Sequence, residues 1–125
     1  MTKNELAFYK ALLPIATSKN LAVFSKVRIA DLLEPIEGSS SWQTAFNKIS
    51  AKHVDFVLCE TNHIRPLLAI ELDDNSHQRA DRDNRDIFVD KAFASAGLPI
   101  IHTLSSAGLS EKIDAHIKTP RPVHS

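Results

Sequence analysis

Three acidic side chains stand inside two short apolar runs near the middle of the chain. Asp55 belongs to the run VDFVL (54–58), and Glu71 and Asp73 belong to LLAIELD (67–73). Because residues i and i+2 of a strand share a face, Glu71 and Asp73 should point the same way. Buried carboxylates are costly unless their charge is compensated, and a hard divalent cation bound by oxygen ligands is the simplest compensation. The pattern favours a metal site formed by Asp55, Glu71 and Asp73.

A Mg²⁺ or Mn²⁺ ion at such a site would suit phosphodiester hydrolysis. The reaction needs an activated water and neutralisation of the charge on a pentacovalent transition state, and one or two metal ions supply both. A proton carrier is also needed, and His77 is the first candidate because imidazole titrates near neutral pH. The cations that could contact substrate phosphates are Lys52, His53, Arg79, Arg82 and Arg85.

Each of these site candidates also has an interpretation that requires no ligand. Asp55 would then be a strand-edge acid bonded to a turn, and Glu71 and Asp73 would lie on the solvated face of an edge strand. The apolar neighbours of all three acids argue against this, because a lone buried acid is costly. His77 fits an ordinary loop histidine equally well. The segment DDNSH lacks the glycine and the terminal glutamate of a calcium-binding loop.

Charged residues at the predicted starts of two helices have a simple structural explanation. Glu5 follows Thr2 by three positions in TKNE, which is the pattern of a capping box. The aspartates and arginines between Asp81 and Asp86 fit a helix start in which acids lie near the positive end of the dipole. The arginines of this cluster could instead contact phosphates, and the sequence leaves both interpretations open.

Composition sets the broad class of the protein. With 125 residues, 43% of them hydrophobic, the chain suits one domain over residues 1–118 followed by a tail at 119–125. Fifteen Lys and Arg balance fifteen Asp and Glu, so only a local basic patch could attract a nucleic acid. The single cysteine, Cys59, excludes an intrachain disulfide and fits a reducing compartment. With no signal segment or membrane-length apolar run, we expect a cytoplasmic domain without membrane contact.

The elements that must position the acids begin with a helix and a strand. Apolar residues recur at helical spacing over residues 6–16, after the capping box. Ser41 can cap a short helix that runs through Ile49, and residues 30–41 are expected to form a loop with one short turn. Residues 21–29 alternate as a strand, which places five side chains on one face: Leu21, Val23, Ser25, Val27 and Ile29.

The second half of the chain starts with a hairpin that carries the acids. Its two apolar runs flank a polar turn around Asn62 and Pro66. A helix, a strand and a last helix are predicted next, over residues 80–96, 98–104 and 111–118. Gly97 should end the first of these helices, and Ser110 can cap the second. The predicted class is α/β.

These segments resemble a known nuclease superfamily. The strands HVDFVL and AIELDD, the histidine after them, the helix RDIFVDKAFASAGLP and an early-helix glutamate carry the resemblance. They are similar to an uncharacterised bacterial domain-of-unknown-function family in the PD-(D/E)XK superfamily, close to the very-short-patch repair endonucleases. The resemblance implies a restriction-endonuclease-like αβββαβ core with a mixed central sheet flanked by helices. It also implies Mg²⁺-dependent phosphodiester cleavage.

The resemblance assigns roles to individual residues. Asp55 corresponds to the aspartate of the "PD" element and Glu71 to the first acid of "(D/E)XK", so together they would hold the metal. Glu5 corresponds to an early-helix glutamate that reaches the metal centre. The chain departs from the motif at its third position, where Asp73 replaces the lysine that would orient water or steady the charge on the phosphorane.

Three functions are therefore compatible with the sequence. The first is a metal-dependent nuclease, with DNA favoured over RNA as its substrate. The second is a nucleic-acid-binding module on the same fold that has lost its chemistry. The third is a protein-docking domain whose acids form ion pairs with Arg82, Arg85 and Lys52.

Overall fold

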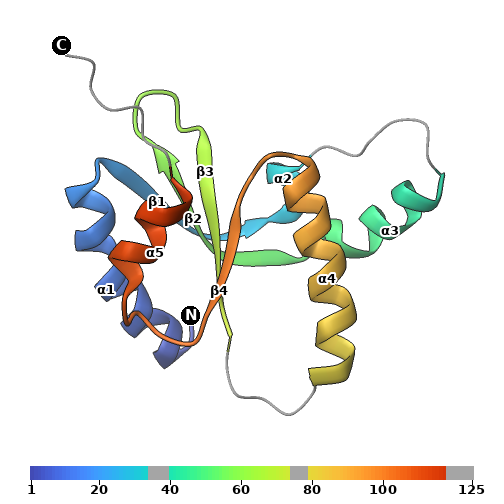
Figure 1. Ribbon diagram of the computed structural model, residues 1–125, viewed down its shortest axis with the longest axis horizontal. Coiled ribbons are helices and arrows are strands. Elements are labelled where there is room, and N and C mark those ends of the chain that lie inside the picture. The colour runs from blue at the N-terminus through green and yellow to red at the C-terminus, as the bar shows by residue number, and fades with distance from the viewer. Residues whose placement is uncertain (34–39, 74–78, 118–125) are drawn as a thin grey trace.

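The chain folds into a four-stranded sheet flanked by helices (Figure 1). The computed structural model describes residues 1–33, 40–73 and 79–117. Its elements are, in order, α1 (Lys3–Ser18), β1 (Leu21–Arg28), α2 (Ile29–Leu32), α3 (Ser40–Ser50), β2 (His53–Glu60), β3 (Pro66–Leu72), α4 (Arg79–Ser95), β4 (Ile100–Thr103) and α5 (Leu109–His116). The predicted α/β class is confirmed, as is the order αβββαβ, with α2 and α3 between the first two strands.

The sheet is mixed, with the strand order β1-β2-β3-β4. β1 pairs with β2 and β2 with β3 in antiparallel orientation, whereas β3 and β4 are parallel. The parallel pair is joined through α4, as parallel neighbours require a crossover connection. This arrangement places β2 and β3, the two strands that carry the acids, at the centre of the sheet.

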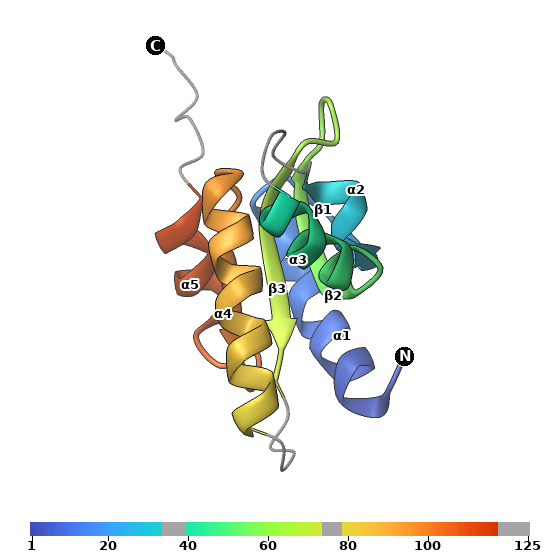
Figure 2. The ribbon, with the colours of Figure 1, turned by 90° about the vertical axis from the view of Figure 1, so that its right-hand side faces the viewer.

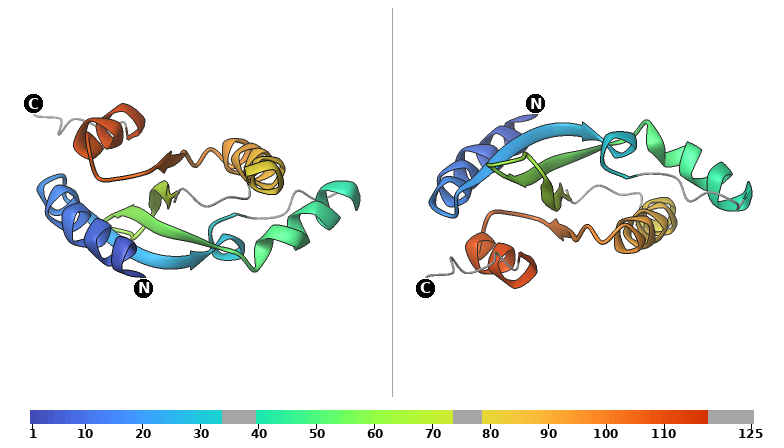
Figure 3. Two further views of the ribbon diagram at one scale, coloured as in Figure 1. Left: turned by 90° about the horizontal axis from the view of Figure 1, so that it is seen from below. Right: turned by 90° about the horizontal axis from the view of Figure 1, so that it is seen from above.

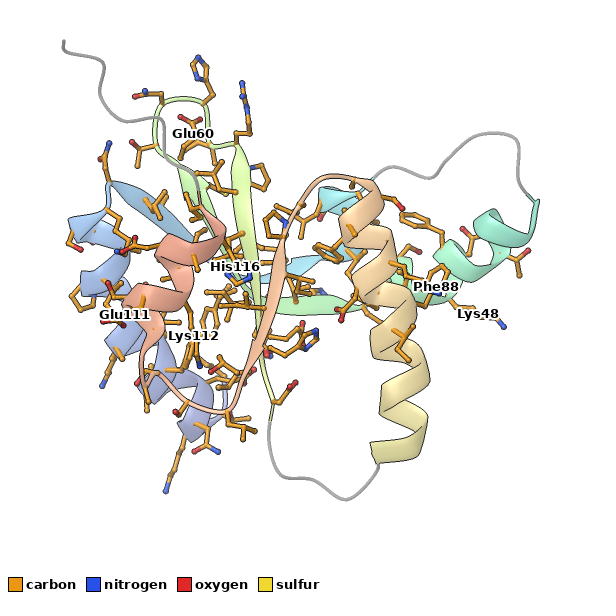
Figure 4. All side chains as sticks on the ribbon, in the orientation of Figure 1. Lys48, Glu60, Phe88, Glu111, Lys112 and His116 are labelled. Atoms are coloured by element: carbon orange, nitrogen blue, oxygen red, sulfur yellow. The ribbon has the colours of Figure 1, made fainter. Side chains whose placement is uncertain are left out.

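Helices cover the two faces of the sheet with separate hydrophobic cores (Figures 2 and 3). On one face, α1 and α5 bury Leu12 and Ile113 against Phe56 and other sheet residues. On the other face, α2, α3 and α4 pack against Val57 and its neighbours. Phe88 of α4 packs against this second core, on the side facing α3 (Figure 4). Alternate residues of the central strands therefore enter different cores, as period-two patterning dictates.

The predicted turn of the hairpin is organised by one carboxylate. Glu60, the last residue of β2, accepts hydrogen bonds from the backbone N–H groups of Asn62 at 3.1 Å and His63 at 2.6 Å (Figure 4). Its own N–H donates to the carbonyl oxygen of Arg65 at 3.0 Å. These bonds satisfy the turn backbone and hold the register of β2 against β3.

The boundary between β1 and the following helices differs from the prediction. Alternation makes Ile29 the last strand residue, but Ile29 begins the one-turn helix α2. There its side chain is buried, and its N–H donates to the carbonyl oxygen of Lys52 at 2.8 Å. The predicted cap Ser41 lies inside α3, which begins at Ser40. Burial of Ile29 in the second core is a tertiary effect that local alternation does not encode.

Two boundaries near the end of the chain also differ. Gly97 ends α4 in the left-handed conformation with φ 74°, as predicted, but Leu98 then closes that helix by donating its N–H to the carbonyl oxygen of Phe93. β4 therefore starts later than the predicted strand. Before α5, Gly108 adopts φ 65°, so the helix begins immediately after it and Ser110 lies in its first turn.

We predict that Phe56→Ala lowers the free energy of unfolding by about 3–5 kcal/mol, because truncating a fully buried aromatic leaves a cavity. Phe56 is 1% exposed and stacks on Phe8 with ring centroids 5.3 Å apart. Phe24→Ala is the matched control, since Phe24 lies on the neighbouring strand and is 42% exposed. Urea unfolding measures the free energy of unfolding of both variants. A similar loss in the two variants would contradict the core assignment.

Candidate functional site

At the acidic end of the hairpin the backbone pairing of β2 with β3 ends, and side-chain interactions hold the two strands together. Its paired residues begin with Phe56 opposite Ile70, and continuing this register by one position sets Asp55 beside Glu71. Asp55 Oδ2 accepts a hydrogen bond from the backbone N–H of Leu72 at 2.8 Å. The carboxylate of one strand thus serves as the acceptor for the backbone of the other. This bond fixes the position of Asp55 next to the second acidic strand.

A lysine that the sequence did not single out lies directly beside Asp55. The β1–β2 register pairs Ser25 with Phe56 and Val27 with Val54, so Lys26 stands across from Asp55. Lys26 Nζ lies 3.5 Å from Asp55 Oδ1 and forms an ion pair with Glu5. The Asp55 side chain is 15% exposed and that of Lys26 is 48% exposed. We call Glu5, Lys26 and Asp55 the lysine cluster.

Glu5 forms the predicted cap and also contacts Lys26. One oxygen, Oε1, accepts a hydrogen bond from the backbone N–H of Thr2 at 2.8 Å, while the Glu5 N–H donates to Thr2 Oγ1 at 3.1 Å. The capping box is therefore confirmed. The other oxygen, Oε2, is the one that binds Lys26. Glu5 consequently fixes the first turn of α1 and joins it to Asp55 through Lys26.

Glu71 lies on the other side of the acidic strand pair, next to a histidine of β4. The parallel register of β3 and β4 pairs Glu71 with His102. His102 Nε2 is 2.8 Å from an Asp90 oxygen in α4, and His102 Nδ1 is 3.7 Å from Asp73 Oδ1. His102 therefore connects α4 to the end of β3.

The ionisation of these groups follows from burial and from their partners. Burial and then the charge of Asp55 raise the pKa of Glu71 to about 8, with Asp73 adding to the rise and His102 opposing it. Burial likewise raises the pKa of Asp55, against the hydrogen bond from Leu72. The Lys26 ammonium lowers the pKa of Glu5 to about 2. For Asp55 and Glu71 burial thus outweighs the partners that favour the charged form, which for Glu71 are His102 and the backbone N–H of Asp55.

A cleft of about 650 Å³ opens beside the lysine cluster. It lies between the first turns of α1, the end of β3 and the segment that follows β4. Its lining combines charged, hydroxyl and apolar groups: Thr2, Asn4, Glu5, Ala7, Phe8, Lys26, Leu72, Asp73, Leu104, Ser105 and Ser106. The volume falls within the range of small-molecule and cofactor sites. Glu5, Lys26 and Asp73 supply its charges.

Some of the remaining candidate site residues are exposed, and the side chains of the others lie outside the described residues. Lys52 and His53 are exposed where β2 begins. Arg79, Arg82 and Arg85 belong to the first turns of α4, but their side chains lie outside the described residues, as does all of His77. Among the residues that the structure describes, no three His, Cys, Asp or Glu side chains form a ready metal-binding group. Cys59 is buried and free.

Lys26 and His102 are the site residues that the sequence interpretation missed. A lysine inside the otherwise alternating segment LAVFSKVRI, and a histidine inside the apolar LPIIHTL, are the signals that could have drawn attention. Neither signal reveals a partner by itself. Lys26 meets Asp55 through an antiparallel register and His102 meets Glu71 through a parallel one, and both registers are properties of the folded sheet.

Comparison with known families identifies the chain. A family model for proteins of unknown function, DUF2726, matches residues 1–119. The chain belongs to the DUF2726 family. No curated protein and no solved structure matches it significantly. Membership confirms the expected relation to a domain-of-unknown-function family, whereas placement of DUF2726 in a nuclease superfamily stays a prediction. None of the helices in the described part of the chain has the length and hydropathy to span a bilayer.

The raised pKa of Glu71 predicts that stability falls as pH rises from about 4.5 to about 8. In this window the folded state holds a proton that the unfolded chain has released, so deprotonation favours unfolding. Each unit of pKa difference corresponds to about 1.4 kcal/mol, so the total loss is several kcal/mol. Glu71→Gln should remove this part of the pH dependence and make the protein more stable than wild type at pH 9.

Urea unfolding at pH 5, 7 and 9 in the presence of a chelator measures this effect. Glu111→Gln, which changes an exposed glutamate on α5, is the matched control and should follow wild type. Identical pH profiles for wild type and Glu71→Gln would show that burial does not raise the pKa of Glu71.

Proposed function

We propose that the chain is a metal-dependent nuclease of the PD-(D/E)XK superfamily that hydrolyses phosphodiester bonds, with DNA as the favoured substrate. The observation that carries this proposal is the placement of Glu71 beside Asp55 where the β2–β3 ladder ends. A fold could bury the same strands with apolar residues at lower cost. Two acids kept at this position, next to a cleft that contains a lysine, favour a site that acts on a phosphate.

The donor set suits a magnesium ion. Mg²⁺ is commonly held by one or two carboxylates, with water and substrate phosphates completing its octahedral shell. Asp55 and Glu71 would supply these carboxylates, and Asp73 is a third oxygen donor at the end of the same strand. A positive ion beside Glu71 would lower its pKa and favour the charged form that burial disfavours. When bound, such an ion activates water and neutralises charge on the transferring phosphate.

The protein itself would position and orient the reacting groups. Leu72 fixes the Asp55 carboxylate through its backbone N–H, and this leaves Oδ1 as the oxygen that faces other partners. Asp90 orients the His102 ring, whose Nδ1 faces Asp73. His102 is therefore an alternative to His77 as the group that would transfer protons near neutral pH, and it lies among the residues that the structure describes.

One observation favours a different function. Lys26 already interacts with both Glu5 and Asp55, which is the kind of ion-pair network expected of a docking or structural domain. In that case the cation is Lys26, whereas the sequence suggested Lys52, Arg82 and Arg85. A binding module that has lost its chemistry is the third possibility, because Asp73 occupies the motif position of the lysine. Metal binding and cleavage distinguish these functions.

Mg²⁺ or Mn²⁺ should raise the melting temperature of the wild-type protein, because a ligand that binds only the folded state stabilises it. At a metal concentration of 100 times Kd the stabilisation is about 2.7 kcal/mol, which corresponds to a shift of roughly 10 °C for a domain of this size. Asp55→Asn should abolish the shift. Asp114→Asn, which alters an exposed acid paired with Lys19, should retain it. A wild-type melting temperature that neither metal changes would favour the ion-pair network.

Cleavage is expected to depend on both strand acids. Wild-type protein with Mg²⁺ or Mn²⁺ should cut plasmid, linear duplex or single-stranded DNA, and a chelator should stop the reaction. Asp55→Asn and Glu71→Gln should each lower the rate by a factor of at least about 100, because the ion that would neutralise charge in the transition state is then no longer held. Gel analysis of the products measures the rate. A metal-dependent melting shift without cleavage of DNA or RNA would favour the binding module.

A further inference from the structure

We propose that Lys26 is the residue that binds the substrate phosphate in this site, so that β1 provides the cation that is absent at the position of Asp73. The inference rests on the proposed nuclease function and assigns a residue to phosphate recognition within it. The ligand is a non-bridging oxygen of a phosphodiester that enters the cleft beside α1. Three properties of Lys26 support this role: its backbone conformation, its partners and its exposure to the cleft.

The backbone at Lys26 has a conformation that a lysine rarely adopts. Its φ is 54°, in the left-handed region, within an otherwise regular strand. Such a conformation costs about 1–3 kcal/mol and persists where the surrounding structure enforces it. The flanking residues Ser25 and Val27 keep their register with β2, so the strained residue is confined to the position opposite Asp55. The strain coincides with the placement of the ammonium between two acids.

The ammonium is held by acids but not enclosed by them. Side-chain exposure is 12% for Glu5 and 15% for Asp55, compared with 48% for Lys26. A lysine ammonium has three donor hydrogens. Glu5 accepts one hydrogen bond and Asp55 lies at 3.5 Å, so at least one hydrogen can face the cleft that Lys26 lines. Glu5 is therefore a positioning residue that holds the cation at the cleft wall.

An anionic ligand in this cleft needs a cation, because the charged side chains around Lys26 are acids. Besides Glu5 and Asp55, the acids Glu71 and Asp73 lie at the same end of the sheet, and a phosphate would be repelled by those of the four that are ionised. Lys26 and Asp73 both line the cleft, so the lysine stands where a substrate would otherwise meet only acids among its charged neighbours. The cleft also offers hydroxyl groups to a phosphate and apolar surface to a sugar or base: Ser105, Ser106, Phe8 and Leu104.

Two substitutions at this position test the assignment. Lys26→Ala removes the ammonium, and Lys26→Gly removes it while accepting φ 54° without strain, so the glycine variant keeps the fold even where alanine weakens it. Lys19→Ala is the matched control, because Lys19 is also paired with an acid, Asp114 at 2.7 Å, near the opposite end of α1. Circular dichroism and urea unfolding establish that each variant is folded before binding is measured.

Binding is measured by fluorescence anisotropy with a labelled DNA duplex and a labelled single strand, in Ca²⁺ so that cleavage is suppressed. Both Lys26 variants should bind DNA at least about tenfold more weakly than wild type and the Lys19 control, as expected for loss of a charge-assisted hydrogen bond. In Mg²⁺ they should cut at least about 100-fold more slowly. The Mg²⁺-dependent melting shift should be retained, because Lys26 is not a metal ligand.

Glu5→Gln tests the positioning role. Glutamine preserves the capping box, so α1 should stay intact while the ion pair with Lys26 is lost. We expect DNA binding to weaken and kcat to fall, with little change in melting temperature. A lower melting temperature with unchanged DNA binding and kcat would mean that the ion pair of Glu5 with Lys26 only stabilises the fold.

The outcomes separate this inference from the proposed function. DNA binding and cleavage that are unchanged in both Lys26 variants, while Asp55→Asn abolishes cleavage, would overturn the role of Lys26 and leave the nuclease in place. A metal-dependent melting shift in a protein that binds no DNA would also overturn it. Cleavage that survives Asp55→Asn, or the absence of any metal-dependent shift, would instead overturn the proposed metal site.

Discussion

The structure depends on how the acids at the end of the β2–β3 pair are accommodated in an apolar sheet. Asp55 and Glu71 have different neighbours, so their charges are accommodated differently. Asp55 accepts the N–H of Leu72 and lies near Lys26, so its charge is shared between a backbone amide and an ammonium. Glu71 has the charge of Asp55 beside it and lies in the sheet, which is why its pKa rises to about 8. The two acids are therefore accommodated by different neighbours although they stand side by side at the end of the strand pair.

The rest of the fold brings partners to this place from distant parts of the sequence. The capping box fixes the first turn of α1 and orients Glu5 toward β1. The crossover through α4 sets β4 parallel to β3 and delivers His102 beside Glu71, with Asp90 of the crossover helix orienting its ring. Two cores on opposite faces of the sheet hold these elements in place. The acids therefore sit between a helix end on one face and a histidine on the other.

Periodicity was sufficient to predict most of the fold. The hairpin, both long helices and the α/β class follow from spacings of two and 3.6 residues, and Glu5 was recognisable as a cap from TKNE alone. The partners in the site were not predictable in this way. Alternation placed Ser25 and Val27 on one face and gave Lys26 no role, because a positive φ at a lysine has no local signature. His102 was hidden for a different reason: a parallel register depends on the packing of α4, which a single sequence does not specify.

In the proposed nuclease, an acid at position 73, where the resembled motif has a lysine, does not by itself argue against phosphate chemistry. A transition state responds to where charge lies, and the chain position that supplies the charge is irrelevant to it. In this sheet, residues that are 29 positions apart, Lys26 and Asp55, stand opposite each other in neighbouring strands. A cation from β1 thus reaches an acid of β2 that lies beside the acidic end of β3. Lys26 and Asp73 both line the cleft, so a cation and an acid from different strands meet at this end of the sheet.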